Sequence, residues 1–281
     1  MKMNLPRLPV FDAKWVRVLG VNVRYFRLGK GAPIVLLHGL GESSTIWAYN
    51  IVQLSKNYTV YALDLPGHGH SDKPKWRYNL NISVDFLSSF LSTLNLERPH
   101  LIGSSLGGMI ALETAFKQPN QLGKLVLVDS AGLGKELPFF LKIMTLPLVG
   151  ELMTIPTKAG FRFLLKQVVA NPHRIPNDLI ESLVQERNRK GNKQSMLRIL
   201  RSSVNIRGIH GHLIDLSRLE HLNVPTYILW GREDKIFPSS HGKNAAMRLP
   251  RGRLTVLNDC GHWPQIEKHR EFNRLIIDFL K

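Results

Sequence analysis

Short, almost continuous apolar runs alternate with longer amphipathic segments along much of the chain. Such runs are typical of parallel strands that helices cover on both faces of a sheet, because both faces of each strand are then buried. Amphipathic segments at 82–94 and 106–117 predict helices between the runs. The predicted strands are residues 33–39, 58–64, 99–104, 124–130, 225–231 and 253–259.

Two departures from this alternation predict the rest of the fold. The apolar runs at 15–20 and 21–29 are adjacent and predict an antiparallel hairpin at the sheet edge. Residues 132–208 contain no clear strand, only helix-forming sequence interrupted by prolines. We therefore predict an α/β core formed by residues 1–131 and 209–281, with an inserted helical cap at 132–208.

The formal net charge of +17 is unusual in an otherwise ordinary globular composition of 43% hydrophobic and 21% charged residues. A basic balance is compatible with nucleic acid, anionic lipid or acidic substrates as partners. No zinc-finger spacing, RNP-type aromatic motif or helix-turn-helix signature accompanies the charge. We therefore expect no nucleic-acid partner and interpret the charge as a solvated basic surface. No pattern indicates an oligomeric state.

Compartment and membrane signals are sparse. A single cysteine, Cys260, excludes an intramolecular disulfide, and residues 1–15 contain two prolines and no apolar core of signal-peptide length. We therefore expect a cytoplasmic location and no secretory signal. The most apolar stretch, 137–155, contains Lys142, Glu151 and two prolines, so we expect no membrane span. We interpret this stretch as an apolar surface that contacts substrate or packs against the core.

A glycine-rich turn follows the apolar run at 99–104. The sequence GSSLG at 103–107 is a G-x-S-x-G pattern, which fits only when it is centred on Ser105 and not on Ser104. A nucleophile on a sharp strand-to-helix turn has a strained backbone, and the flanking glycines let strand and helix approach closely. We predict Ser105 as the nucleophile, with the positive end of the next helix beside the developing oxyanion.

A serine nucleophile requires a base, and the base requires an orienting acid. His262 follows the last predicted strand in a glycine-containing loop, and Asp234 follows the preceding strand. Loops at the carboxyl ends of parallel strands share one edge of the sheet with the Ser105 turn. We predict His262 as base and Asp234 as acid, with Asp129 and Glu233 as the alternatives for the acid.

An oxyanion hole requires two N–H donors. We predict the backbone N–H groups of Leu40, in the turn after the first parallel strand, and Leu106, directly after the nucleophile. His38 and Gly39 are expected to shape the first of these turns.

Two H-x-H pairs, at 68–70 and 210–212, suggest metal binding at first sight. No carboxylate or cysteine set with ligand spacing accompanies either pair, so we predict no metal site. We also predict no cofactor, because ester hydrolysis requires neither an electron sink nor a metal.

Five motifs in order carry a family resemblance: HGLG, DLPGHGHSDKP, GSSLGG, GREDKIFP and GHWPQIEKHREFNRLIIDFL. Together they resemble the α/β-hydrolase superfamily along nearly the whole chain apart from the cap. The resemblance implies an eight-stranded, mostly parallel sheet with a helical lid after the sixth strand. Ser105 departs from haloalkane dehalogenases and epoxide hydrolases, which have aspartate at that position, so those two chemistries are disfavoured.

The C-terminal motif is similar to that of the meta-cleavage product hydrolases, which split carbon–carbon bonds in dienoic ketoacids. That resemblance implies substrate-binding roles for Trp263, after the histidine, and for Arg187 in the cap. The chain lacks the Gly-Pro-Gly stretch of that family and has Ser104 where asparagine is common. In these two features it resembles general carboxylesterases.

The main functional prediction is a carboxylic ester hydrolase that forms an acyl-enzyme on Ser105 and accepts small-molecule esters with apolar acyl or aryl groups. The alternative is a carbon–carbon bond hydrolase that acts on dienoic ketoacids. Another serine chemistry, such as lactone hydrolysis, and a hydrolase-like receptor are further possibilities.

Overall fold

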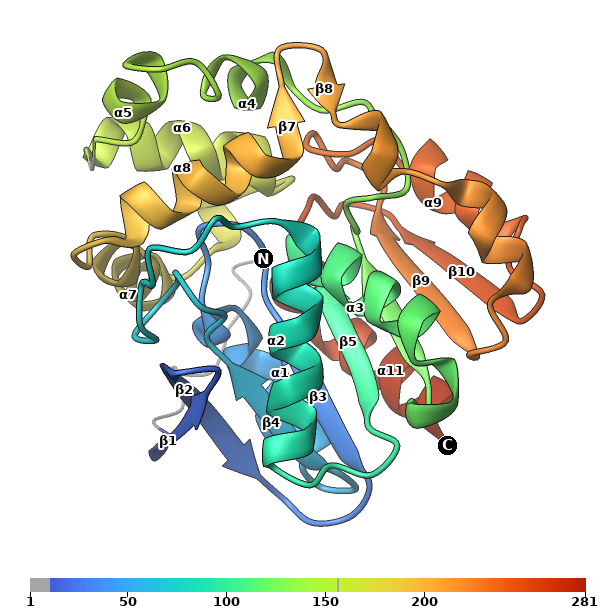
Figure 1. The fold of residues 1–281 in the computed structure, drawn as a ribbon. Coiled ribbons are helices and arrows are strands. Elements are labelled where there is room, and N and C mark those ends of the chain that lie inside the picture. Colours follow the sequence, from blue (N-terminus) through green and yellow to red (C-terminus); the bar gives the residue numbers. More distant parts are fainter. Residues whose placement is uncertain (1–10, 156) are drawn as a thin grey trace.

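One mixed sheet organises the structure, a computed structural model that describes residues 11–155 and 157–281. Its strands are β1 (Ala13–Val18), β2 (Val21–Leu28), β3 (Pro33–Leu37), β4 (Thr59–Leu63), β5 (His100–Ser104), β6 (Leu125–Val128), β9 (Thr226–Gly231) and β10 (Gly252–Leu257). Their order across the sheet is β1-β2-β4-β3-β5-β6-β9-β10 (Figure 1). The β1–β2 hairpin is antiparallel at the edge, and the strands from β4 to β10 are parallel. The predicted eight-stranded, mostly parallel sheet is confirmed.

Burial explains why the middle strands carry unbroken apolar runs. Every residue of β4, β6 and β9 is buried, because helices cover both faces of the sheet there. β10 is an edge strand and is buried only at its last residue. The parallel register brings the carboxyl ends of β5, β6 and β9 to one edge, where loops can meet.

Helices of the core form the two outer layers (Figure 1). The helices of this core are α1 (Ala48–Leu54), α2 (Leu80–Thr93), α3 (Leu106–Lys117), α9 (Ser240–Ala246), α10 (Pro264–Glu267) and α11 (His269–Leu280). α2 and α3 pack against each other on one face of the sheet, and α1 packs against α11 on the other. Trp47 and Phe272 fill the space beneath α1 and α11, with ring centroids 6.2 Å apart.

A group of short helices lies between β6 and β9 in the chain and above the sheet edge (Figure 1). It comprises α4 (Phe139–Ile143), α5 (Val149–Met153), α6 (Lys158–Val168), α7 (Asn177–Arg187), α8 (Asn192–Ser203) and the hairpin β7 (Val204–Asn205) and β8 (Gly208–Ile209). The expectation that no strand occurs before 208 is wrong for this hairpin. Two-residue strands are too short to show an alternating pattern.

The structure bears on the expected absence of a membrane span, but largely not on the expected absence of a secretory signal. No helix of the described residues is long and apolar enough to cross a membrane, and the stretch 137–155 is divided between α4 and α5. The absence of a secretory signal concerns residues 1–15, of which 1–10 lie outside the described residues.

A buried ion-pair network attaches the cap to the core. Arg24 of β2 pairs through Nε with Asp64, at 2.8 Å, and through Nη2 with Glu186 of α7, at 3.0 Å. The hydroxyls of Ser43 and Thr45, which follow β3, also donate to the Glu186 carboxylate. All of the charged groups are largely buried, so water cannot replace these contacts. We call this network the cap latch.

We expect Glu186→Ala to lower the free energy of unfolding by about 3 kcal/mol, because it removes one partner from a buried ion pair. This loss is at the low end of the range for breaking a buried ion pair, because Arg24 still pairs with Asp64. Urea unfolding measures it, with Glu181→Ala, an exposed glutamate of the same helix, as the matched control. Equal midpoints for the two variants would show that the latch contributes no stability.

Candidate active site

Ser105 lies on the sharp turn between β5 and α3. Its backbone has φ 53° and ψ −117°, a conformation that is strained for a residue with a side chain. A Cβ on Gly103 would lie 2.3 Å from the Gly107 carbonyl oxygen, and one on Gly107 would lie 2.4 Å from that of Leu37. Helix α3 therefore approaches β5 and the end of β3 so closely that only glycine fits at positions 103 and 107. The serine lines a cavity of about 120 Å³ under the cap.

The neighbouring serine lies elsewhere. Ser104 is fully buried, and its Oγ accepts a hydrogen bond from Gln265 Nε2 at 3.4 Å. Of the two serines, only Ser105 lines the cavity.

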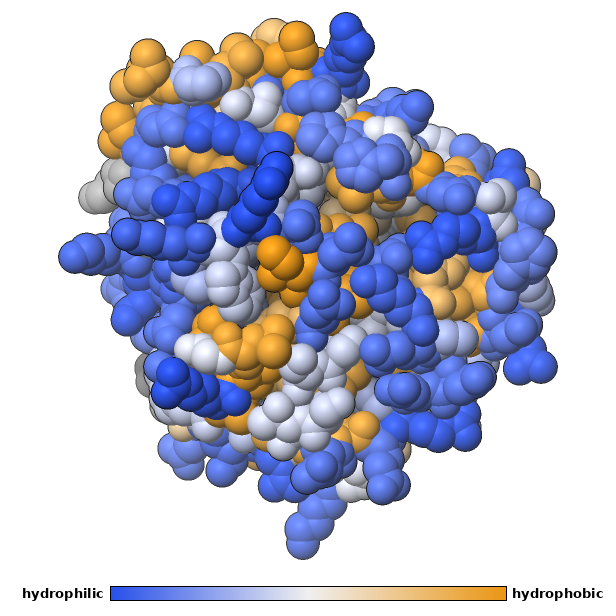
Figure 2. Space-filling view, viewed as in Figure 1, coloured by the Kyte–Doolittle hydropathy of each residue, from blue (hydrophilic) through white to orange (hydrophobic). Residues whose placement is uncertain are grey.

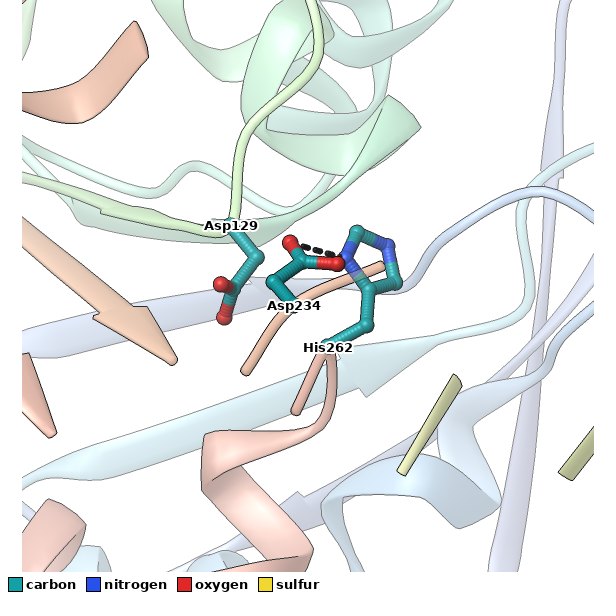
Figure 3. A group of neighbouring side chains, drawn as sticks. All are labelled: Asp129, Asp234 and His262. Carbon is teal, nitrogen blue, oxygen red and sulfur yellow. Dashed lines mark hydrogen bonds and ion pairs between the residues drawn. The ribbon is translucent and has the colours of Figure 1, made fainter. Parts of the chain in front are cut away.

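His262 and Asp234 come together above the sheet edge (Figure 3). Imidazole Nδ1 donates to Asp234 Oδ2 at 2.8 Å, since an ionised carboxylate can only accept. The other oxygen, Oδ1, accepts the backbone N–H groups of Ile236 and Phe237, at 2.7 and 3.2 Å. These contacts fix the carboxylate and leave Nε2 of the imidazole on the side away from Asp234, as Figure 3 shows. His262 lines the same cavity as Ser105.

Charges around the imidazole oppose its desolvation. Burial by itself disfavours the protonated ring, but the charge and hydrogen bond of Asp234, with smaller contributions from Glu42 and Glu267, outweigh it. The pKa of His262 therefore lies above its ordinary value of 6.5. Burial likewise raises the pKa of the Glu267 carboxyl to about 7. The site is arranged to stabilise an imidazolium.

The two alternative acids are placed differently from Asp234. Asp129 Oδ1 accepts the Gly231 N–H at 2.9 Å, while Oδ2 has no partner in the described part of the chain. Burial, and then the nearby charge of Asp234, raise the pKa of Asp129 well above its ordinary range, which favours its protonated form. Glu233 accepts the backbone N–H of Cys260 instead. Asp234 is thus the carboxylate that contacts the imidazole.

Two backbone N–H groups are free beside the serine. Neither Leu40 nor Leu106 donates its N–H to an acceptor within 11–155 and 157–281. A Cβ on Gly39 would lie 3.1 Å from Ser105 Cβ, so the loop after β3 lies directly against the serine. His38 holds this loop from below, where its Nε2 accepts a backbone N–H from the segment after β4 at 2.9 Å.

Glu42 is a site residue that the sequence analysis missed. Its Oε2 accepts the Gly39 N–H at 2.8 Å, and its Oε1 accepts Trp263 Nε1–H at 2.7 Å. Trp263 is buried and lines the cavity. The carboxylate therefore joins the loop that carries Leu40 to the residue after His262.

Arg187, at the end of α7, lies in the same cavity as Ser105 and His262. A Cβ on Gly41 would lie 3.8 Å from its Cζ, which places the guanidinium beside the loop after β3. Burial lowers its pKa and the charge of Glu42 partly offsets this. No carboxylate of the described residues lies within 4.0 Å of the guanidinium, and its recorded polar contact is Met196 Sδ at 3.8 Å. The cation is therefore available to a ligand.

By distance alone, one group of side chains fits a metal ion, because ligand atoms of Asp129, Asp234 and His262 lie within 4.8 Å of one another. Hydrogen bonds already occupy both oxygens of Asp234 and Nδ1 of the imidazole. The H-x-H pairs at 68–70 and 210–212 are not part of any such group of three in the described chain. The prediction of no metal site stays a prediction.

A sequence model of the alpha/beta hydrolase fold family matches residues 32–269. The chain belongs to this family. It is 32% identical over 275 residues to a 2-hydroxy-6-oxononadienedioate/2-hydroxy-6-oxononatrienedioate hydrolase of Pseudomonas putida, with 94% and 93% of the two chains covered. The structure resembles a meta-cleavage product hydrolase from Pseudomonas fluorescens IP01, with TM-score 0.83, 27% identity and coverage of 95% and 96%. A bacterial membrane phospholipase A gives TM-score 0.83, 26% identity and coverage of 96% and 86%.

These comparisons confirm the predicted superfamily and the likeness to meta-cleavage product hydrolases. This α/β-hydrolase is therefore a hydrolytic enzyme. The roles of its individual site residues are proposals, and they are argued below from the geometry.

We expect Asp129→Asn to alter how stability depends on pH. The raised pKa of Asp129 means that the folded protein loses stability as pH rises from about 4, the unfolded pKa, towards the folded one. Asparagine cannot ionise, so the variant gains on wild type over that range, by at most about 1.4 kcal/mol per pH unit. Urea unfolding between pH 4 and 7 measures the difference. A difference that is constant with pH would contradict the assignment.

Proposed function

We propose that this α/β-hydrolase cleaves a carbon–carbon bond in 2-hydroxy-6-oxo-dienoate substrates, with Ser105, His262 and Asp234 as the catalytic residues. The observation that carries the proposal is Arg187, whose unpaired guanidinium lines the same cavity as Ser105 and His262. A partly buried cation that no carboxylate of the described residues pairs with favours a substrate that brings a carboxylate. The hydrolase of P. putida, which is named for such diacids, supports this alternative over the ester hydrolysis placed first by the sequence analysis.

In this proposal the hydrogen bonds of the site support the following proton transfers. Asp234 holds Nδ1–H of His262, so Nε2 accepts the proton of Ser105 as Oγ attacks the ketone carbon. The N–H groups of Leu40 and Leu106 then donate to the oxyanion. Glu42 supports the reaction indirectly, because it fixes the Gly39 amide next to Leu40 and helps to stabilise the imidazolium.

A carbon leaving group requires an electron sink, and the substrate itself supplies it. A proton shifts from the enol hydroxyl to the carbon of the scissile bond, which produces a 2-oxo acid. When the tetrahedral intermediate collapses, the bonding electrons move through the conjugated system onto that 2-oxo group. The resulting enolate takes up the proton that His262 accepted from Ser105, which returns the imidazole to its neutral form. Water, activated by His262, then releases the acyl group from Ser105. The sum is one substrate and one water giving a dienoic acid and a carboxylic acid.

Arg187 has a defined part in this sequence. A guanidinium that binds the carboxylate next to the 2-oxo group also favours negative charge in that end of the substrate, where the enolate develops. No step requires a metal or an electron carrier, so the proposal includes no cofactor. A cytoplasmic location, expected from the single cysteine, belongs to the same proposal.

Carboxylic ester hydrolysis is the second candidate. The cavity beside Ser105 is lined mostly by apolar side chains, among them Met109, Leu137 and Val168, and one similar structure is a phospholipase A. An ester reaction uses the same serine, histidine and N–H donors, but an alkoxide leaves directly and Arg187 has no role in it.

Parallel rate measurements distinguish the two reactions. We would follow disappearance of a 2-hydroxy-6-oxo-dienoate by its absorbance, and hydrolysis of p-nitrophenyl acetate, butyrate and octanoate, with the same enzyme preparation. Faster turnover of the dienoate, judged by kcat/KM, supports carbon–carbon hydrolysis. Turnover of the esters alone transfers the assignment to the second candidate.

We expect Ser105→Ala to lower kcat on whichever substrate is turned over by about 10⁴-fold or more, because the covalent step is lost. Ser104→Ala is the matched control, since this serine faces Gln265 and not the cavity, and its rate should stay within about threefold of wild type. The opposite ranking would place the nucleophile at position 104.

We expect Arg187→Gln to raise KM for the dienoate by about 10- to 100-fold, the value of a charge-assisted hydrogen bond. Rates on uncharged p-nitrophenyl esters should change little. Arg189→Gln, two residues further along and exposed, controls for the general loss of a positive charge. Equal effects on both substrate classes would show that Arg187 does not bind the carboxylate.

A further inference from the structure

The outer side of the cap exposes large apolar side chains at unusual density. Figure 2 shows them as a band over α4 and α5, at the top of the view, above a band of hydrophilic residues along α8. We call them the cap apolar surface; its members are Phe139, Leu146, Leu148, Leu152, Met153, Ile155 and Phe163. A continuous exposed apolar area of this kind on a folded protein indicates a partner.

Packing within the cap directs these side chains outward. The rings of Phe140 and Phe163 meet edge to face, with centroids 5.7 Å apart, which joins α4 to α6. On the inner side, Arg201 of α8 pairs with Glu151 of α5 at 2.8 Å and donates to the carbonyls of Thr145 and Leu146. The polar side of α5 is thus occupied by α8, and its apolar side remains for solvent or a partner.

Leu148 is exposed even though its backbone conformation is unfavourable for leucine. Its backbone has φ 66°, in the left-handed region that disfavours residues with a β-carbon, and its side chain is 76% exposed. Leu152, one helical turn later, is 67% exposed.

Positive charge surrounds the cap apolar surface. The predicted cap, 132–208, contains 13 Lys and Arg residues against 5 Asp and Glu. The exposed Arg162 of α6 directly precedes Phe163, and Lys142 of α4 and the exposed Lys166 of α6 lie three residues from Phe139 and Phe163. None of these three cations forms an ion pair with another described residue. Apolar side chains bordered by unpaired cations match a bilayer with anionic headgroups.

Three members of the cap apolar surface also line a cavity beneath the cap. Met153, Ile155 and Phe163 line a cavity of about 730 Å³ that reaches Arg187 under the cap. Arg187 in turn lines the smaller cavity that contains Ser105. The two cavities therefore share Arg187 as a lining residue, and the cap apolar surface contributes side chains to the larger of them.

We propose that the cap apolar surface docks this enzyme on an anionic lipid bilayer, with Leu148 and Leu152 inserted beneath the headgroups and Lys142 and Arg162 at the phosphates. A second copy of the chain fits less well, because a two-fold contact through this surface would bring the unpaired cations of both caps together. The proposal does not depend on which bond the enzyme cleaves.

Vesicle co-sedimentation of the full chain tests it. Ser105→Ala protein is used so that lipid hydrolysis cannot interfere, with vesicles of phosphatidylcholine alone and of equal parts phosphatidylcholine and phosphatidylglycerol, at about 0.1 M ionic strength. We expect sedimentation with the anionic vesicles and at least about tenfold weaker binding when Leu148→Asp and Leu152→Asp are added. Met247→Asp, a 78% exposed apolar position in the core, is the matched control and should bind like its parent.

Other outcomes overturn the proposal. Unchanged binding of the double variant would mean that charge alone attracts the protein, and absence of sedimentation with every vesicle would exclude a lipid partner. Light scattering tests for association between copies of the chain. If the parent protein is an oligomer and the double variant is a monomer, this surface is a contact between copies. Circular dichroism confirms that each variant is folded, and Phe139→Ser, at a 73% exposed position, provides an independent second change in the same surface.

Discussion

The close approach of β5 and α3 is the constraint on which the site depends. A carbonyl oxygen of α3 lies where a Cβ at Gly103 of β5 would be, and one of β3 lies where a Cβ at Gly107 would be, so α3 meets both strands at backbone-to-backbone distance. This forces the residue between β5 and α3, Ser105, into a strained conformation at the end of the strand. Because the sheet is parallel there, the loops after β3, β6, β9 and β10 arrive at the same edge and bring the remaining groups to the serine.

The buried carboxyl groups near that serine differ in their surroundings, and this difference sets the electrostatics of the site. Asp234 accepts three hydrogen bonds, whereas burial and the charge of Asp234 favour the protonated form of Asp129. The charged carboxylate is thus the one that touches His262. Glu42 adds a second negative charge, held by two N–H donors between the oxyanion loop and Trp263. Both carboxylates raise the pKa of His262.

The cap is attached to the core next to residues of the candidate site. Glu186, the centre of the cap latch, immediately precedes Arg187, so the latch also sets where the guanidinium lies. At the end of α6, the Val168 carbonyl accepts the His262 N–H at 2.6 Å, and Glu267 accepts N–H groups of both Gly261 and Ala170. Within the described residues, no hydrogen bond or ion pair ties α4 or α5 to the core, and these two helices carry much of the cap apolar surface.

The sequence by itself determined the α/β alternation, the edge hairpin and the serine turn, because each depends on neighbours within a few residues. It also predicted His262 and Asp234, since strand ends in a parallel sheet share one edge. Only the tertiary structure decided between Asp234 and Asp129 as the imidazole's partner, joined Glu42 to Trp263 and joined Arg24 to Glu186, which are 221 and 162 residues apart. It also decided which side of 137–155 meets water. In helices of five residues hydrophobic periodicity cannot separate a buried face from an exposed one, and only packing against α8 makes that distinction.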